Sequence, residues 1–276
     1  MKKAIFTIAI GDDPSFQYSI EAMRTYAKKI GAELIVAREK RYPYIPFEKP
    51  NMGKSAYIEK LYVKTLLQDY DRVLYLDADI LVTPHAPDIF AAYPREDTVY
   101  MFNEGLYEDR SQAIKKITTI LPYKEPWPTE QGKHIYYNAG VILCSQQSNL
   151  FAYASVDMLL KVVTVPFCDQ TYFNYLINKH NLRAEAIHHT YNLMDIFDNA
   201  ERRFGANFIH YAGNGYCKKP KHKYRVIIKD FCRLYQSKLT LLDKIKNNYC
   251  FPIKRYLTKR FIWSRVAKHK NRYFLD

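Results

Sequence analysis

The stretch that decides the fold reads RVLYLDAD over residues 72–79. A run of apolar, strand-forming residues ends in two carboxylates, Asp77 and Asp79, and a second apolar run, Ile80-Leu81-Val82, follows at once. A short apolar run bounded by polar residues is typical of a buried strand. Because ligands sit off the carboxyl ends of the strands in an open α/β sheet, the pattern predicts both aspartates at the lip of a cleft.

The two aspartates also point to a metal. Neither has a Lys or Arg next to it in the sequence, so two like charges are expected to repel each other at one strand end. A divalent cation removes that cost, and carboxylate oxygens suit Mg²⁺ or Mn²⁺, which typically bridge to nucleotide phosphates. The alternative is that both are solvated loop residues.

The elements before this strand alternate between strand and helix. A helix that begins near Pro14 and stops at Gly31 separates two apolar runs, and a second helix leads into residues 72–79. This β-α-β-α-β order predicts an α/β fold with a doubly wound, mostly parallel sheet flanked by helices. The elements predicted by residue range are strands 4–10, 33–37, 72–77, 99–102, 136–143 and 207–211, helices 14–30, 54–67, 150–163 and 169–179, the last one capped by Asp169, and an irregular or weakly helical segment 103–133.

Composition limits the class of protein and its compartment. The chain has 276 residues, 48% of them hydrophobic, which is enough for a sizeable core. Five cysteines without a Cys-x-x-Cys pair argue against a disulfide framework and a structural zinc site, and favour a reducing compartment. The apolar start imitates a signal peptide, but Asp12 and Asp13 follow it without a cleavage pattern, so we expect a strand there. No run is long enough for a transmembrane helix.

The net charge of +14 is concentrated near the C-terminus, where residues 216–276 hold 18 Lys and Arg against 3 Asp and Glu. We therefore expect two parts, a nearly neutral α/β domain over 1–217 and a basic, helical extension over 218–276. Apolar residues at helical spacing within 227–235 and 253–262 indicate amphipathic helices, which favour an anionic membrane surface. The alternatives are a structural subdomain packed on the core and nucleic-acid binding. The expected location is the cytoplasm, at the inner face of a membrane.

A second polar cluster follows the last predicted strand. His210 is followed by a glycine-rich turn that includes Gly213, and then by Lys218 and Lys219. A neutral imidazole can complete a metal site begun by two carboxylates. Backbone N–H groups of such a turn and a lysine suit phosphate. Taken alone, the cluster favours a histidine that happens to end a strand, with Lys218 and Lys219 as the start of the basic tail.

Four motifs occur in order and at the spacing of a known family. Leu76-Asp77-Ala78-Asp79, Asn138-Ala139-Gly140-Val141, Asp169-Gln170 and His210-x-x-Gly213 resemble the signature of family 8 retaining glycosyltransferases over roughly residues 1–220. The resemblance implies the GT-A fold, a UDP-sugar donor and Mn²⁺ or Mg²⁺. The metal ligands it implies are Asp77, Asp79 and His210.

The resemblance also implies roles around the donor. We expect the groups that line uridine, ribose and the diphosphate to be Ile8, Ala9, Gly11, Lys60, Asp77, Ala78, Ala139, Gly213 and either Lys218 or Lys219. The residues implied beside the reacting sugar are Asn138, Asp169 and Gln170. The acceptor is expected over Asn103–His134, which holds Glu104, Tyr107 and Trp127 and precedes Tyr137.

Three functions remain open from the sequence. The favoured one is a metal-dependent retaining glycosyltransferase that moves a hexose or N-acetylhexosamine from a UDP-sugar to a glycan or lipid-linked glycan. The second is a nucleotidyltransferase that forms an NDP-sugar, although the loop Gly11-Asp12-Asp13 lacks the basic residue such enzymes usually have. The third is a basic nucleic-acid-binding module. It has no use for the Asp77, Asp79 and His210 set, so no nucleic-acid partner is expected.

Overall fold

In a computed structural model, the chain is described over residues 1–42, 56–197, 200, 202–217 and 223–236. The first elements are β1 (Lys3–Ile8), α1 (Phe16–Ile30) and β2 (Glu33–Ala37). Strand β1 lies parallel to both β2 and β3 (Arg72–Asp77). Gly31 ends α1 in the left-handed region, with φ of 65°, and its N–H donates to the Ala27 carbonyl. The predicted β-α-β opening is confirmed.

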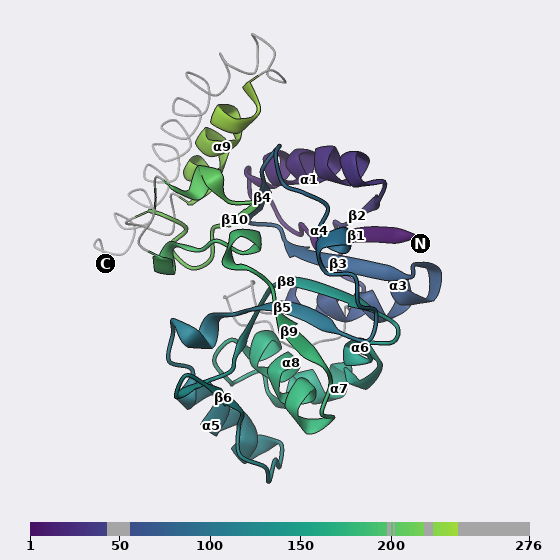
Figure 1. The fold of residues 1–276 in the computed structure, drawn as a ribbon, viewed down its shortest axis with the longest axis vertical. Coiled ribbons are helices and arrows are strands. Elements are labelled where there is room, and N and C mark those ends of the chain that lie inside the picture. The colour runs from purple at the N-terminus through teal and green to yellow at the C-terminus, as the bar shows by residue number, and fades with distance from the viewer. Residues whose placement is uncertain (43–55, 198–199, 201, 218–222, 237–276) are drawn as a thin grey trace, which may run out of the picture. The chain divides into compact units, whose positions relative to one another are not determined.

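The central sheet has six strands in the order β2-β1-β3-β8-β5-β9 (Figure 1). Its remaining members are β8 (Tyr137–Ser145), β5 (Val99–Asn103) and β9 (Ala184–Ala186). Strand β8 runs antiparallel to β3 and β5, whereas the other pairings are parallel. The mostly parallel sheet predicted from the sequence is therefore confirmed. Because β8 runs in the opposite direction, its first residues lie at the edge of the sheet where β3 and β5 end. Residues from the start of β8 can therefore meet residues from the ends of β3 and β5.

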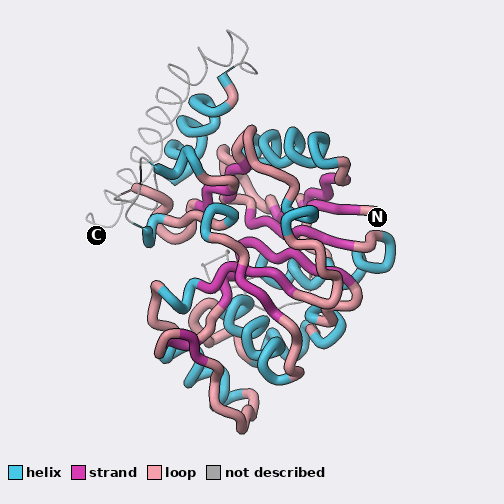
Figure 2. The backbone as a smooth tube through the Cα atoms, viewed as in Figure 1, coloured by secondary structure: helices cyan, strands magenta, loops and turns pink. Residues whose placement is uncertain are grey.

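Helices cover both faces of this sheet (Figure 2). Alternate strand residues such as Phe6 and Tyr75 pack on one side, in the same apolar cluster as residues of α3, α5, α6, α7 and α8. Ile5 and Leu74 pack on the other side with α1, α4 and the short β4–β10 pair. The bounds are α3 Val63–Asp69, α4 Ile89–Ala92, α5 Ser111–Ile120, α6 Leu150–Tyr153, α7 Val156–Lys161, α8 Cys168–Lys179, β4 Ile80–Val82 and β10 Phe208–His210.

Short elements complete the described chain. They are 3₁₀ turns η1 (Tyr57–Tyr62), η2 (Glu104–Leu106), η3 (His189–Tyr191), η4 (Asp195–Phe197) and η5 (Arg202–Gly205), and the hairpin of β6 (Thr129–Glu130) and β7 (Lys133–His134).

Three local predictions need correction. The predicted helix 54–67 begins outside the described residues, and its described part is a 3₁₀ turn, η1, followed by α3. The predicted helix 150–163 is two helices, because the Ser155 hydroxyl accepts from the Met158 N–H and starts α7 anew. Segment 103–133 contains a regular helix, α5, whose Ala113, Ile114 and Ile117 are buried.

The last described helix, α9 (Lys223–Leu234), lies within a compact unit that spans Met1–Leu234. The helix itself was predicted from the spacing of its apolar residues, and Ile227, Ile228 and Phe231 are buried, as the alternative of a segment packed on the core implies. The Phe231 ring meets Tyr18 of α1 edge to face, with 5.2 Å between ring centroids. The compact unit thus reaches beyond the boundary that we expected at Lys218. The second predicted amphipathic segment, 253–262, lies outside the described residues.

Among the described helices, none has both the length and the apolar character needed to cross a membrane.

Candidate active site

Asp77 is the last residue of β3, and Asp79 lies in the short turn that leads to β4. Strand β10 pairs antiparallel with β4, and this register sets His210 opposite Ile80. His210 Nε2 lies 3.4 Å from Asp79 Oδ1 and 3.8 Å from Asp77 Oδ2. One ligand atom from each of the three residues lies within 4.8 Å of the others. Two carboxylates and an imidazole are a donor set that suits Mn²⁺ or Mg²⁺, so the residues present fit the metal that the sequence implied.

Two lysines from distant parts of the chain neutralise the aspartates, which the sequence had not indicated. Lys60 is buried, and its Nζ lies 2.7 Å from Asp169 Oδ2, 3.2 Å from Asp77 Oδ1 and 3.0 Å from the Ala139 carbonyl. Burial opposes the charge of Lys60, but Asp169 and Asp77 outweigh it and raise its pKa above the ordinary value. The expectation that Asp77 lacks a cationic neighbour is therefore wrong, because Lys60 is close in space and not in sequence.

The second lysine, Lys223, comes from the start of α9 and lies 2.8 Å from Asp79 Oδ2. Burial disfavours its charge, whereas Asp79 favours it, with the net effect of raising the Lys223 pKa. For Asp79, burial favours the neutral acid, but the neighbouring Lys223 ammonium holds the pKa of the carboxyl well below its usual range. The stem of Lys223 packs on Gly215, where an added Cβ would lie 2.6 Å from its Cδ. The glycine-rich turn thus makes room for a lysine that the sequence analysis missed.

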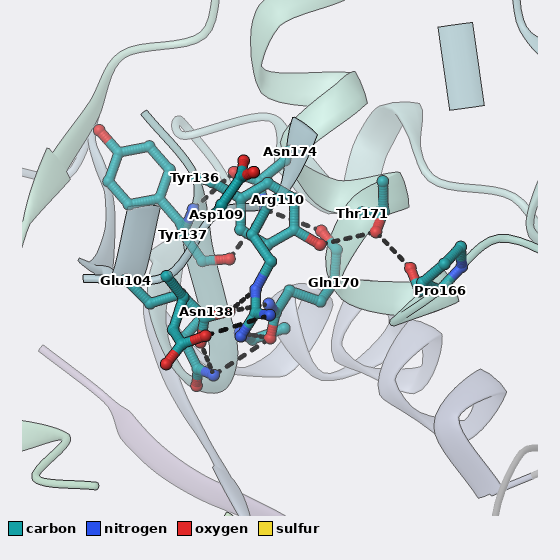
Figure 3. Close-up of polar contacts among 12 residues, drawn as sticks. Glu104, Asp109, Arg110, Tyr136, Tyr137, Asn138, Pro166, Gln170, Thr171 and Asn174 are labelled. Carbon is teal, nitrogen blue, oxygen red and sulfur yellow. Dashed lines mark hydrogen bonds and ion pairs between the residues drawn. The ribbon is translucent and has the colours of Figure 1, made fainter. Parts of the chain in front are cut away.

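The opposite wall is a network of side chains around Glu104, at the carboxyl end of β5 (Figure 3). The buried Glu104 carboxylate accepts from Arg110 Nε at 2.7 Å, Asn138 Nδ2 at 2.7 Å and Gln170 Nε2 at 2.9 Å. Gln170 Oε1 in turn accepts from the Ala139 N–H at 3.1 Å. Every amide and carboxylate in this wall has a fixed partner, so the wall is a preorganised polar surface.

Both walls face one pocket of about 540 Å³. The structure brings most of the predicted site residues to its lining, and these are Lys60, Asp77, Asp79, Asn138, Ala139, Asp169, Gln170, His210 and Gly213. Glu104, Arg110, Phe167, Asp195 and Lys223 also line it, and the sequence had assigned them no part in the donor site. Two of them carry a signal of position, because Glu104 directly follows β5 and Phe167 directly precedes α8, at the same edge of the sheet.

Other predicted donor residues do not line this pocket. Ile8 is the register partner of Asp77 in the β1–β3 pair, and the buried Ala9 and Ala78 share a small apolar cluster beside it. Gly11 follows in the turn after β1, with φ of 101°. Lys218 and Lys219 lie outside the described residues. The roles of these residues remain predictions.

Two predictions about side chains are wrong. Asp169 does not cap α8, because the helix begins at Cys168, and Asp169 in its first turn pairs with Lys60 instead. In the predicted acceptor segment, Trp127 is buried in the core and its Nε1 donates to the Ile135 carbonyl at 2.8 Å. Tyr137 is also buried. Neither ring is accessible to a sugar, whereas Tyr107 is 48% exposed.

Comparison with known proteins identifies a family and a fold. A family model described as Glycosyl transferase family 8 matches residues 16–220. The fold is similar to that of galactosyltransferase LgtC, solved in complex with donor and acceptor sugar analogues, with a TM-score of 0.58 and 17% identity over 88% of this chain and 99% of that one. It is also similar to a glycosyltransferase involved in glycosylation of the major capsid of PBCV-1, with a TM-score of 0.54 and 12% identity over 83% of this chain and 100% of that one. A search of curated proteins found no match. At these identities the structural likeness shows the fold, that of the GT-A glycosyltransferases.

Proposed function

This chain belongs to glycosyl transferase family 8 and is a glycosyltransferase, and on that premise we propose that it uses a UDP-sugar and a divalent metal to transfer a hexose or N-acetylhexosamine with retention. The acceptor in this proposal is a glycan or a lipid-linked glycan. Family membership decides between the three functions that the sequence left open, since it favours glycosyl transfer over NDP-sugar synthesis and nucleic-acid binding.

One observation supports the metal and the donor above all others, namely the Asp77, Asp79 and His210 cluster inside the pocket. Mn²⁺ held by these residues would neutralise the negative charge that develops on UDP as the sugar leaves. The three ligand atoms come from two neighbouring segments, β3–β4 and β10, which the β4–β10 pairing holds together. The site is therefore built on paired strands, although the ligands themselves stand at strand ends.

The cationic groups of the chain fit the diphosphate. Lys223 lies on the pocket wall about a quarter exposed, so its ammonium is available to a phosphate as well as to Asp79. Gly213, with φ of 55°, forms the turn beside it, where backbone N–H groups can approach an anion. We therefore assign to Lys223 the diphosphate contact that the sequence analysis gave to Lys218 or Lys219.

The polar wall fits the donor sugar. Asn138, Gln170 and Glu104 present hydrogen-bonding groups that can hold sugar hydroxyls in one orientation. Asp169 remains the candidate for the acidic group beside the anomeric carbon, and its ion pair with Lys60 holds the carboxylate in place. A fixed carboxylate near the anomeric carbon would stabilise an oxocarbenium-like transition state.

A donor screen tests this proposal. We expect the protein to hydrolyse at least one of UDP-glucose, UDP-galactose and the UDP-N-acetylhexosamines slowly in Mn²⁺, and to lose this activity in excess EDTA. Asp79→Ala should abolish turnover without unfolding the protein, whereas the exposed Asp157→Ala, which lies outside the pocket, should retain it. Full activity of Asp79→Ala in EDTA would remove the metal from the mechanism.

For location, we propose that the chain works in the cytoplasm and that its basic extension, residues 218–276, attaches it to an anionic membrane. The apolar face of α9 is buried within the compact unit, so its part in such an attachment would rest on its basic residues. A vesicle pull-down with and without anionic lipid, at low and high salt, checks this. Binding that does not respond to lipid charge would contradict it.

A further inference from the structure

The orientation of the Asn138 side chain is set by a backbone group. Its Oδ1 accepts from the Gly140 N–H at 2.9 Å, and a backbone N–H can only donate. The amide nitrogen at the other end donates to Glu104 Oε2 at 2.7 Å and to Gln170 Oε1 at 3.1 Å (Figure 3). The hydrogen bonds at both ends of the side-chain amide require the same orientation, so they determine which of its two atoms is the oxygen.

Asn138 in turn orients Asn192, which is fully buried. Asn192 Nδ2 donates to Asn138 Oδ1 at 3.0 Å, and this turns Asn192 Oδ1 towards His210 Nδ1 at 2.7 Å. Because an amide oxygen only accepts, Nδ1 of the histidine must bear the hydrogen. A neutral imidazole has a single N–H, so His210 Nε2 keeps its lone pair, and this atom faces Asp77 and Asp79.

Gly140 adds a steric condition to these hydrogen bonds. A Cβ at this position would lie 2.3 Å from His210 Cε1 and 2.9 Å from Nδ1, so the imidazole packs directly on the backbone of β8. Asn138 and Gly140 are two residues apart on that strand and lie on the same face of the sheet. One strand thus orients the ring and supplies the space that it occupies.

We propose that Asn192, Asn138 and Gly140 are positioning residues that present His210 Nε2 to the divalent cation, so that the Asn-Ala-Gly segment of β8 serves metal binding in addition to the donor sugar. The metal half of this inference rests on the proposed function. Outer partners of metal-binding histidines fix the tautomer and the direction of the ring, and their loss typically weakens metal binding by roughly 10- to 100-fold.

The affinity for Mn²⁺, measured from the electron paramagnetic resonance signal of the free ion, tests the metal half. Asn192→Leu keeps the volume of the side chain but removes the acceptor, so we expect binding to weaken about 10- to 100-fold. Gly140→Ala should weaken it as well. Asn207→Leu is the matched control, because Asn207 precedes β10 at the end away from His210, and its side chain donates to Thr190 Oγ1 instead.

A double-mutant cycle separates positioning from general damage to the site. In a His210→Ala background, Asn192→Leu should cause no further loss of Mn²⁺ affinity, because the ring that it orients is absent. An equal loss in both backgrounds, or no loss in either, would overturn the inference.

The tautomer is measurable without any metal, by ¹⁵N NMR of the metal-free protein at a pH where the imidazole is neutral. We expect the Nδ1–H form of His210 in the parent and in Asn192→Asp, which keeps an acceptor oxygen, and a shift to Nε2–H in Asn192→Leu. The His210→Ala spectrum assigns the signal. An Nε2–H parent overturns the positioning role, whereas a parent that binds no Mn²⁺ overturns the metal dependence in the proposed function and leaves the tautomer result standing.

Discussion

Replacing Lys60 by Met tests how much the buried ammonium group of Lys60 stabilises the folded protein. The side chain is 2% exposed and contacts Asp169, Asp77 and the Ala139 carbonyl. Removing one partner of a buried ion pair typically costs about 3–5 kcal/mol, because the remaining charge is left without compensation. Asp77 is a quarter exposed and water can solvate it, so we expect the lower end, about 3 kcal/mol. For a domain of this size that is a loss of roughly 6–12 °C in Tm.

The pH dependence gives the same substitution a sharper readout. In the parent, the folded state raises the pKa of Lys60 above its pKa in the unfolded chain. Charged Lys60 therefore contributes fully to stability at any pH below the unfolded-state pKa. This contribution is lost only in the strongly alkaline range, as the pH rises through the folded-state pKa. In Lys60→Met, the buried carboxylate of Asp169 has lost its cation, and protonation relieves it. The stability deficit should therefore shrink as the pH falls into the range where carboxylates titrate.

Chemical denaturation of both proteins from neutral to acidic pH measures this deficit. Lys64→Met is the matched control, since Lys64 is exposed and makes one long contact to the Ala152 carbonyl at 3.4 Å. We expect it to stay within about 0.5 kcal/mol of the parent. A Lys60→Met variant less than about 1 kcal/mol below the parent at neutral pH, or a deficit that grows in acid, would refute the reasoning.

Three further outcomes follow from single side chains. Lys223→Met removes the ammonium that competes with a metal cation for Asp79. Titration calorimetry should therefore show that the variant binds Mn²⁺ about fivefold more tightly (~1 kcal/mol) and binds UDP more weakly than the parent. An unchanged affinity for Mn²⁺ would contradict this. Asp230→Asn removes the buried carboxylate that binds Arg203 through two hydrogen bonds, and should cost about 3 kcal/mol in the free energy of unfolding; a loss below about 1 kcal/mol would argue against the pair. Burial raises the pKa of Cys144 to about 12, so its thiol is protonated at pH 8 and should react with a thiol reagent only after the protein unfolds. Mass spectrometry of the labelled protein measures this reaction. Rapid labelling of Cys144 in the folded protein would contradict the prediction.

Periodicity and strand-end chemistry were enough to predict the main features of the fold and the position of the two aspartates. Apolar runs predicted β1, β2 and β3, and the rule that ligands gather at carboxyl ends of strands placed Asp77 at a pocket. His210 could be added only because its spacing from Gly213 resembled a family motif, since nothing local links residues 80 and 210.

Pairings between distant residues could not be predicted in the same way. Lys60 and Asp169 are 109 residues apart, and their contact depends on how η1 and α8 pack against the sheet. The Trp127 error has a different origin, because the acceptor was assigned to segment 103–134 from its position between the donor motifs alone. Helical spacing of Ala113, Ile114 and Ile117 was present in that segment and would have indicated α5.

Strand β8, which runs antiparallel to its neighbours in the central sheet, contributes residues to both walls of the pocket. The number of residues that precede β8 therefore affects both walls. Asn138 belongs to the polar wall and Gly140 supports the histidine, and both depend on the same pleat of β8. Since successive side chains point to opposite faces, a slip of one residue would turn both positions away from the pocket at once. Deletions or insertions just upstream of Tyr137 should therefore be compatible with activity only when the β6–β7 hairpin absorbs them.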